Sequence, residues 1–213
     1  MEIKIQPIRP FSPLIAKIKL PSEIIKKLND YFDETIKDEK KLKKRNHANY
    51  LAGNVSNEIA LENQFMLDSG WLEFLGKVTQ KYVEIGTNKK IKEFNIIGSW
   101  IVSQFKHEYN PTHWHNGHIS GAGFLKVPKK MGGTFNKKKN NETQNGYLQM
   151  IHGTKQFLSN SIYNIKPEVG DLYLFPNYMM HTVFPFSETN EERRSVSFNA
   201  VIDEDIQNVY KSN

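Results

Sequence analysis

The feature that most constrains this fold is a change in the spacing of apolar residues near residue 94. Before this point, apolar side chains recur every three or four positions in two stretches, 22–36 and 64–86, as on one face of a helix. After it, apolar and polar residues alternate in short runs separated by turn-forming residues, which is typical of strands. Six strands are expected, at 94–106, 119–127, 146–151, 161–166, 171–175 and 193–201. Helices followed by many short strands predict an α+β fold with a jelly-roll core and supporting N-terminal helices.

The remaining segments are expected to be edges, linkers and loops. Residues 3–20 alternate but contain three prolines, which favours one or two strands at a sheet edge. Residues 37–45 are mostly charged and predict a solvated linker, while residues 50–63 contain a glycine turn and little periodicity. The loop 129–145 has no core residues and is either a mobile lid or a disordered connector.

The chain is expected to form a single domain, because 213 residues are enough for one core. Within it we expect edge strands and buttressing helices at 1–93, the jelly-roll catalytic core at 94–201 and a C-terminal tail at 202–213.

The composition narrows the kinds of site and partner. There is no cysteine, which excludes disulfides, cysteine-ligated zinc and iron–sulfur clusters and favours a cytoplasmic location. No secretory signal or membrane span is expected, because no apolar run approaches about 18–20 residues. The net charge of +6 indicates a lysine-rich solvated surface. Aromatic residues are not interleaved with the lysines, so a nucleic-acid partner is not favoured.

The segment 107–121 is the strongest candidate for a chemical site, because it holds four of the seven histidines. His113 and His115 are separated by one residue, so both imidazoles lie on one face of an extended strand, about 6–7 Å apart along it. Two such imidazoles can converge on one metal ion. His181 follows a buried strand and a proline stop and is the candidate third ligand, which would leave three open positions on the metal. His118 is an alternative second ligand.

The last expected strand carries a polar face. Arg193, Ser195, Ser197 and Asn199 share one side, and Arg194, Val196 and Phe198 share the other. A buried arginine needs a partner, and a guanidinium binds a carboxylate through two parallel hydrogen bonds. This row therefore indicates a binding site for a carboxylate ligand. The alternative is a surface strand whose polar face meets solvent.

Several further residues are interpreted from their position alone. We interpret His47 and His152 as surface or locally hydrogen-bonded residues, and Asp171 as a turn residue. His107 is expected to lie on the strand, outside the site. Trp114 is expected to face away from the metal and to pack. Trp100 and Gln104 share a strand face and line either the pocket or the core, and it remains open whether Tyr173 and Phe175 or Leu172 and Leu174 face inward.

Four motifs in this chain together resemble the Fe(II)- and 2-oxoglutarate-dependent oxygenases. They are 108–115, Ser120-Gly121, 170–176 with His181, and 193–199, and they span roughly residues 95–201. The similarity is greatest to the small prolyl-hydroxylase-like group of bacteria and tailed phages. It implies a double-stranded β-helix (jelly-roll) core, iron ligation by His113, His115 and His181, and binding of 2-oxoglutarate by Arg193 and Ser195. Most of this superfamily has a carboxylate where this chain has His115.

The resemblance implies a dioxygenase, expected to be a hydroxylase, that couples decarboxylation of 2-oxoglutarate to oxidation of a substrate by molecular oxygen. Its cofactors would be Fe(II) and 2-oxoglutarate, with ascorbate as an optional reductant, in the host cytoplasm if the protein is phage-encoded. The primary substrate is left open between a peptide or protein and a small molecule. The alternatives are a cupin-like metal dioxygenase that does not use 2-oxoglutarate and a non-catalytic phage jelly-roll module.

Overall fold

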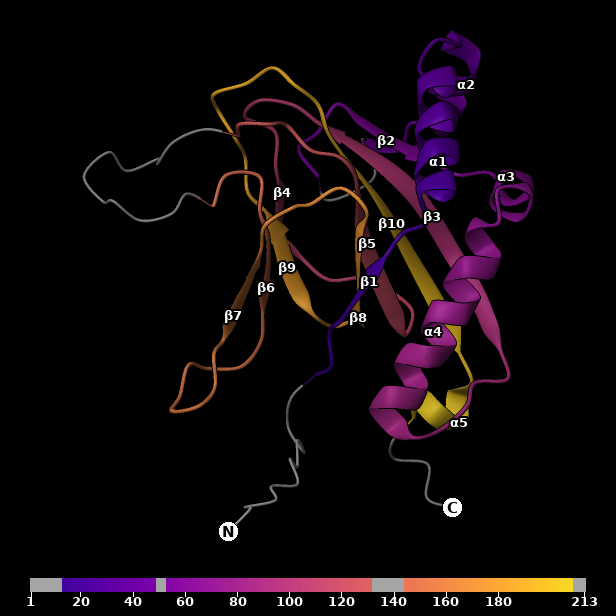
Figure 1. The fold of residues 1–213 in the computed structure, drawn as a ribbon, viewed down its shortest axis with the longest axis vertical. Coiled ribbons are helices and arrows are strands. Elements are labelled where there is room, and N and C mark those ends of the chain that lie inside the picture. The colour runs from indigo at the N-terminus through magenta and orange to yellow at the C-terminus, as the bar shows by residue number, and fades with distance from the viewer. Residues whose placement is uncertain (1–12, 49–52, 132–143, 209–213) are drawn as a thin grey trace.

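The structure is a computed structural model that describes residues 13–48, 53–131 and 144–208 (Figure 1). Its helices are α1 (Ser22–Thr35), α2 (Glu39–Arg45), α3 (Asn63–Asp68), α4 (Trp71–Thr87) and α5 (Glu204–Gln207). Its strands are β1 (Ala16–Lys19), β2 (Asn57–Ala60), β3 (Phe94–Gln104), β4 (Asn110–His113), β5 (Ile119–Lys126), β6 (Leu148–Ile151), β7 (Ile162–Ile165), β8 (Asp171–Pro176), β9 (Met180–Val183) and β10 (Arg193–Ile202).

The strands form two antiparallel sheets that face each other. The larger sheet has the order β1-β8-β5-β10-β3-β2, and the smaller has the order β4-β9-β6-β7. This arrangement confirms the predicted α+β fold with a jelly-roll core. The six strands predicted from the alternation appear as β3, β5, β6, β7, β8 and β10, with ends within two residues of those expected.

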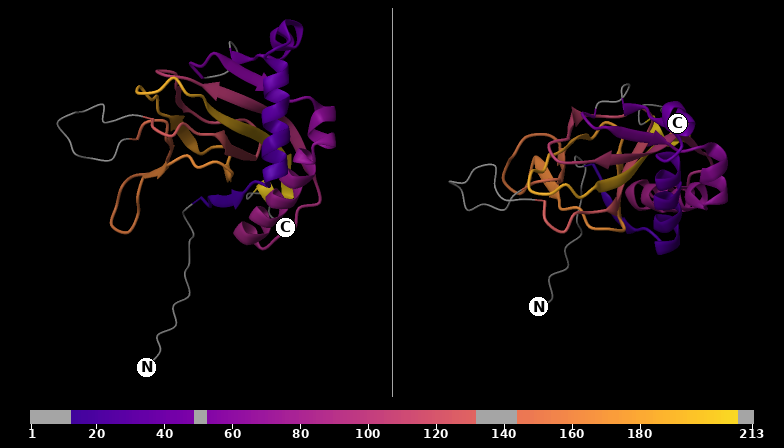
Figure 2. Two further views of the ribbon diagram at one scale, coloured as in Figure 1. Left: turned by 45° about the horizontal axis from the view of Figure 1, so that its top comes forward. Right: turned by 90° about the horizontal axis from the view of Figure 1, so that it is seen from above.

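Two long helices, α1 and α4, cover the outer face of the larger sheet (Figure 2). The buried residues of α1 are Ile24, Leu28, Phe32 and Thr35, whose spacing of three and four residues forms one stripe on the helix. They join a core in which Trp71 of α4 and Phe198 of β10 are fully buried and meet edge to face. The helices therefore fix the back of the sheet and leave its other face to the smaller sheet.

The space between the two sheets has its own core. Phe124, Leu148, Met150, Tyr173 and Phe175 meet there. Leu172 and Leu174, which alternate with Tyr173 and Phe175 along β8, instead join the core beneath the helices. Strand β8 is buried on both faces, so its sequence carries no polar row that marks the inner side.

The regions predicted to be irregular contain regular elements. Residues 39–45 form α2, because the Asp38 carboxylate accepts hydrogen bonds from the backbone of Lys40 and Lys41 and caps the helix. The linker prediction for 37–45 was wrong for this reason. The segment 57–60 is strand β2, which pairs with β3 and was not expected.

The helix predicted at 64–86 is two helices, α3 and α4. The chain turns at Ser69 and Gly70, where Gly70 adopts the left-handed conformation with φ of 79°. Periodicity continued across this point because both helices bury residues against the same core.

The N-terminal prediction is confirmed where the structure describes it. Strand β1 lies at the edge of the larger sheet beside β8, as the prolines indicated. Residues 3–12 lie outside the described residues. So do residues 132–143 of the loop 129–145, and its role as a lid stays a prediction. Among the described helices, none combines the length and the apolar character needed to cross a lipid bilayer.

Candidate metal centre and anion pocket

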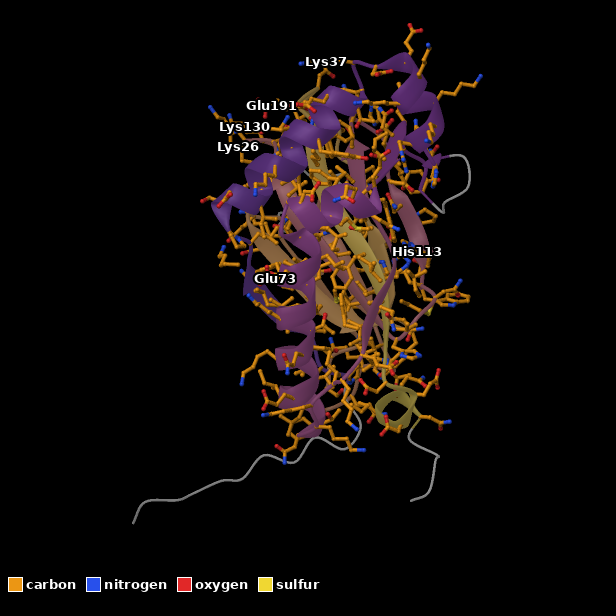
Figure 3. All side chains as sticks on the ribbon, turned by 90° about the vertical axis from the view of Figure 1, so that its right-hand side faces the viewer. Lys26, Lys37, Glu73, His113, Lys130 and Glu191 are labelled. Atoms are coloured by element: carbon orange, nitrogen blue, oxygen red, sulfur yellow. The ribbon has the colours of Figure 1, made fainter. Side chains whose placement is uncertain are left out.

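Three histidines meet where the ends of two strands of the smaller sheet lie side by side. His113 ends β4 and lies directly opposite His181 of β9, so both side chains leave the sheet on the same face. His115 follows two residues later. The candidate ligand nitrogens of all three lie within 4.8 Å of one another, and Nε2 of His115 is 3.2 Å from Nε2 of His181. Figure 3 shows His113 to the right of α4, the helix that carries the labelled Glu73.

Backbone carbonyls hold two of the rings in a defined orientation. Nδ1–H of His113 donates to the carbonyl oxygen of Pro111 at 2.7 Å, and Nδ1–H of His181 donates to that of Met179 at 2.8 Å. A donor at Nδ1 leaves the lone pair of a neutral imidazole on Nε2. The two Nε2 atoms are therefore available as ligands, in the arrangement that metal-binding histidines use.

The surroundings keep the histidines neutral. Burial lowers the pKa of His115 to about 3, and repulsion from His181 and His113 acts in the same direction. Burial and repulsion from His113 lower the pKa of His181 to about 4, and burial also lowers the pKa of His113. Only a neutral imidazole can bind a metal ion, so the cluster is ready to do so near pH 7.

The geometry fits a metal ion with open coordination positions. Two nitrogens about 2.1 Å from one ion and at right angles lie roughly 3 Å apart. The 3.2 Å between Nε2 of His115 and Nε2 of His181 is close to this value. Three ligands on one side of an ion, with free positions opposite, are the arrangement of non-haem Fe(II) sites.

The same pocket contains a buried cation. Arg193 is 2% exposed, and its side chain lines the pocket together with the three histidines and Ser195. Its Nε donates to the carbonyl oxygen of Gly146 at 3.0 Å, and its Nη1 lies 3.5 Å from Oγ of Ser195. Among the described residues no carboxylate forms an ion pair with it. Burial lowers the pKa of Arg193 to about 10, so it remains charged near pH 7.

The pocket thus has a metal site and, among the described residues, a guanidinium without a carboxylate partner. Its apolar lining residues are Trp100, Val102, Ala122, Phe124, Leu148 and Val183. The guanidinium carbon of Arg193 lies 5.1 Å from the centre of the Phe124 ring. Apolar walls exclude water, so an anion that reached Arg193 would bind it strongly.

A larger cavity, of about 450 Å³, lies between the start of β1 and the β6–β7 hairpin. Size alone would favour it, but its lining includes neither Arg193 nor any of the three clustered histidines. The smaller pocket combines a metal-binding cluster with an unpaired cation, and we assign the chemistry to it on that ground.

Comparison with known proteins agrees with this assignment. Residues 98–199 match a family described as "Putative 2OG-Fe(II) oxygenase". Over this core, the chain is similar to the 2OG-Fe(II) oxygenase family. No curated protein matches the sequence.

Solved structures similar to this chain include three prolyl hydroxylases. A prolyl-4-hydroxylase from Pseudomonas putida has a TM-score of 0.57 and 14% identity, over 87% of this chain and 91% of its own. The viral collagen prolyl hydroxylase of Paramecium Bursaria Chlorella virus-1 has a TM-score of 0.54 and 15% identity, over 87% and 94%. A prolyl hydroxylase from Trichoplax adhaerens, solved with a hypoxia inducible factor peptide fragment, has a TM-score of 0.54 and 12% identity, over 93% and 87%. At these identities the likeness establishes the fold.

The structure brings His113, His115, His181, Arg193 and Ser195 into one pocket. His118, the alternative second ligand, is not in the histidine cluster. Its Nδ1 accepts a hydrogen bond from the backbone N–H of Ile202 at 3.0 Å, so it holds the end of β10 in place.

Trp100 lines the same pocket and meets His115, with ring centres 5.7 Å apart. Gln104 is buried outside the pocket lining and donates its amide hydrogens to the carbonyl oxygens of Glu108 and Phe184. Both residues share the inner face of β3, as the alternation predicted, and only one of them reaches the pocket.

Two interpretations of single residues were wrong. Trp114 does not line the pocket, but it is 64% exposed and so does not pack as expected. Asp171 is the first residue of β8 and is fully buried, and it forms ion pairs with Lys17 and Lys19 of the neighbouring strand β1. His47 and His152 are exposed, as expected. His107 lies outside the site, but it is in a turn after the end of β3, with φ of 69°, and not on the strand as expected.

Two polar residues beside the pocket, Asn110 and Glu58, were not identified from the sequence. Asn110 begins β4 and lines the pocket. Glu58 lies on β2, next to Asn110, and is 1% exposed. A single glutamate in a segment without periodicity carries no local signal of burial, because its position depends on the pairing of β2 with β3.

Proposed function

We propose that this protein is an Fe(II)- and 2-oxoglutarate-dependent dioxygenase that acts as a hydroxylase. The observation that carries the proposal is the unpaired, buried Arg193 in the same apolar pocket as the three neutral histidines. A buried charge without a partner is unfavourable, so a protein retains one where a ligand supplies the opposite charge. A dicarboxylate can bridge a metal ion and an arginine.

In this proposal, Nε2 of His113 and of His181, together with His115, holds Fe(II). Arg193 and Ser195 bind the distal carboxylate of 2-oxoglutarate, since a guanidinium and a hydroxyl both donate hydrogen bonds to carboxylate oxygens. When bound, Fe(II) and 2-oxoglutarate supply the oxidation of a substrate by molecular oxygen, with loss of carbon dioxide from the cosubstrate.

The remaining groups of the pocket orient the histidine ligands and exclude water from the site. The carbonyls of Pro111 and Met179 keep two ligand nitrogens turned toward the metal site. The apolar residues Val102, Leu148 and Val183 exclude bulk water between the histidines and Arg193. A rigid, dry site favours reaction with the intended substrate over side reactions.

The names of the similar structures support a peptidyl substrate. Two of them are a prolyl-4-hydroxylase and a collagen prolyl hydroxylase, and a third was solved with a peptide fragment. We therefore propose a prolyl-hydroxylase-like activity on a peptide or protein, with a small molecule as the other candidate. Ascorbate would serve as an optional reductant.

Titration with 2-oxoglutarate tests the proposal. The Fe(II)-loaded protein should develop the charge-transfer absorbance of an iron–2-oxoglutarate complex, and Arg193→Ala should raise the dissociation constant at least tenfold, because a charge-assisted contact contributes roughly 1.5–3 kcal/mol. Ser195→Ala should have a smaller effect in the same direction, and the iron content of both variants should equal that of the wild type.

The matched control is Arg194→Lys, which changes the neighbouring arginine on the opposite face of β10. It should leave the affinity for 2-oxoglutarate unchanged. Binding of iron without any response to 2-oxoglutarate would favour a cupin-like dioxygenase. Absence of both iron binding and a response to 2-oxoglutarate would favour a non-catalytic module.

A further inference from the structure

A buried carboxyl group lies beside the pocket and has no charged partner. Glu58 of β2 lies directly opposite Val102 of β3, which lines the pocket. The next residue, Ile59, packs in the core beneath the helices, so Glu58 points toward the space between the sheets. It is 1% exposed.

The surroundings of this carboxyl are poor in donors. Its Oε2 has no hydrogen-bond partner among the described residues, and the one side chain that hydrogen-bonds to the carboxyl is the amide of Asn110. Burial raises the pKa of Glu58 to about 7, and Asn110 lowers it only in part. No lysine, arginine or histidine contributes to this pKa.

The backbone at Gly53 packs closely against the Glu58 carboxyl group. A Cβ at Gly53 would lie 2.5 Å from Oε1 of Glu58 and 3.0 Å from Nδ2 of Asn110, so a larger residue could not occupy this position without displacing the pair. Asn110 in turn lines the pocket three residues before His113. Glu58 therefore contacts Asn110, a residue that lines the pocket, but does not line the pocket itself.

The candidate metal site lacks negative charge. Its three ligands are neutral imidazoles, whereas the 2-His-1-carboxylate site of non-haem Fe(II) oxygenases contributes one negative charge. A dication in an apolar pocket without a counter-charge is unfavourable. Glu58 is a buried carboxyl group beside the pocket that no other charge in the described residues neutralises.

We infer that Glu58 is the counter-charge of the metal site and replaces, from the pocket wall, the negative charge that His115 does not provide. This inference rests on the proposed metal site. In this proposal, Glu58 stabilises the ion electrostatically across the space between them and does not coordinate it. It also explains why an unpaired glutamate is kept in a position where it weakens the metal-free fold.

Titration with Co(II), followed by its visible absorbance, tests the inference without any need for turnover. Glu58→Gln removes the charge and keeps the shape, and it should raise the Co(II) dissociation constant by about tenfold or more. Glu58→Asp, which keeps the charge, should recover most of the affinity. Glu62→Gln is the matched control, because it removes a solvent-accessible carboxylate four residues away and should leave the affinity unchanged.

Thermal unfolding of the metal-free proteins distinguishes an effect of the Glu58 charge on metal binding from a role of Glu58 in holding the fold together. At pH 8, Glu58→Gln should melt at the wild-type temperature or higher, because it removes an unpaired buried charge. A lower melting temperature together with weaker Co(II) binding would mean that Glu58 only supports the fold, and the inference would be wrong. Equal Co(II) affinities for wild type and Glu58→Gln would also overturn it.

A double variant provides the sharpest comparison. In a His115→Asp background the ligand itself carries a negative charge, so the further change Glu58→Gln should alter Co(II) affinity by about threefold or less. An undiminished effect in that background would exclude charge replacement. If the wild-type protein bound no Co(II), the proposed metal site would fail, whereas loss of the Glu58 effect alone would leave that site intact.

Discussion

At the scale of single residues, the most informative side chains are those whose surroundings do not neutralise them. In the part of the chain that the structure describes, Arg193 is a buried cation without a carboxylate partner, and Glu58 is a buried carboxyl without a cationic partner. Each lies in or beside the pocket that holds the three histidines. Asp171, by contrast, is a buried carboxylate that forms ion pairs with Lys17 and Lys19. Buried charged groups without an oppositely charged partner are candidates for ligand binding.

Substitution of His115 tests the ligand set. His115→Ala should weaken iron binding by at least tenfold, because two protein ligands remain, whereas His115→Asp should retain iron because it restores the more common facial triad. Elemental analysis after dialysis measures the bound iron. Normal iron content in His115→Ala would show that the second ligand lies elsewhere, and His118→Ala, which should keep its iron, is the matched control.

Glu58 should make the stability of the metal-free protein depend on pH. Burial raises its pKa from 4.5 to about 7, so between these values the folded protein holds a proton that the unfolded chain has lost. This contribution to stability is therefore present below about pH 4.5 and is lost as the pH rises to about 7, by up to roughly 3 kcal/mol. Urea unfolding at several pH values, compared between wild type and Glu58→Gln, should reveal a flatter dependence in the variant. Identical profiles would contradict the burial of this carboxyl.

At the scale of elements, one ion network joins helix α1 to the last strand. Arg194 of β10 donates to Asp33 and Glu192 at 2.7 Å each, and its guanidinium lies 4.0 Å from the centre of the Phe32 ring. Arg194 therefore points toward the helices, while Arg193 points into the pocket. Two adjacent arginines have opposite roles because successive side chains of a strand point to opposite faces.

Arg194→Ala should consequently affect stability and not ligand binding. The change leaves Glu192 and Asp33 without their buried partner and should lower the free energy of unfolding by about 3 kcal/mol. The affinity of the folded protein for 2-oxoglutarate should change less than twofold. Arg45→Ala, which breaks the more exposed pair with Glu62, should cost under about 1 kcal/mol and is the control for urea unfolding. A large loss of 2-oxoglutarate affinity in Arg194→Ala would mean that the register of β10 differs from the one described.

The elements also differ in how well local sequence predicted them. The six strands after residue 94 were predictable, because alternation over several residues reflects one buried face. Strands β4 and β9 carry His113 and His181 and were not predicted, because neither Asn-Pro-Thr-His nor Met-His-Thr-Val alternates apolar and polar residues. The sequence therefore indicated the ligands more clearly than the strands that hold them.

At the scale of the whole molecule, the two sheets have separate tasks. The larger sheet rests on α1 and α4 and supplies Arg193, Ser195 and Glu58, whereas the smaller sheet supplies His113 and His181. The pocket lies between the sheets, so a ligand that contacts both should hold them together.

2-Oxoglutarate should therefore raise the melting temperature more when the metal is bound than when it is absent. With bound metal, 2-oxoglutarate at a hundredfold excess over its dissociation constant stabilises the folded state by about 2.7 kcal/mol, or roughly 5–10 °C for a chain of this size. Without metal the shift should be much smaller, because one end of the dicarboxylate lacks its partner. Thermal unfolding with and without Fe(II) under argon measures these shifts in melting temperature. Succinate in place of 2-oxoglutarate is the control. Equal shifts in both conditions would contradict a site shared by metal and cosubstrate.

The sequence by itself determined the features that depend on neighbouring residues. Alternation along 193–199 placed Arg193 and Ser195 on one face, and the spacing of His113 and His115 brought their rings together. The tertiary structure alone decided which face of β8 looks inward, that residues 57–60 form a strand, and that Glu58 is buried beside the pocket. These properties arise from contacts between segments far apart in the chain, and burial, which sets the charge state of Glu58 and Arg193, exists only once those segments have packed together.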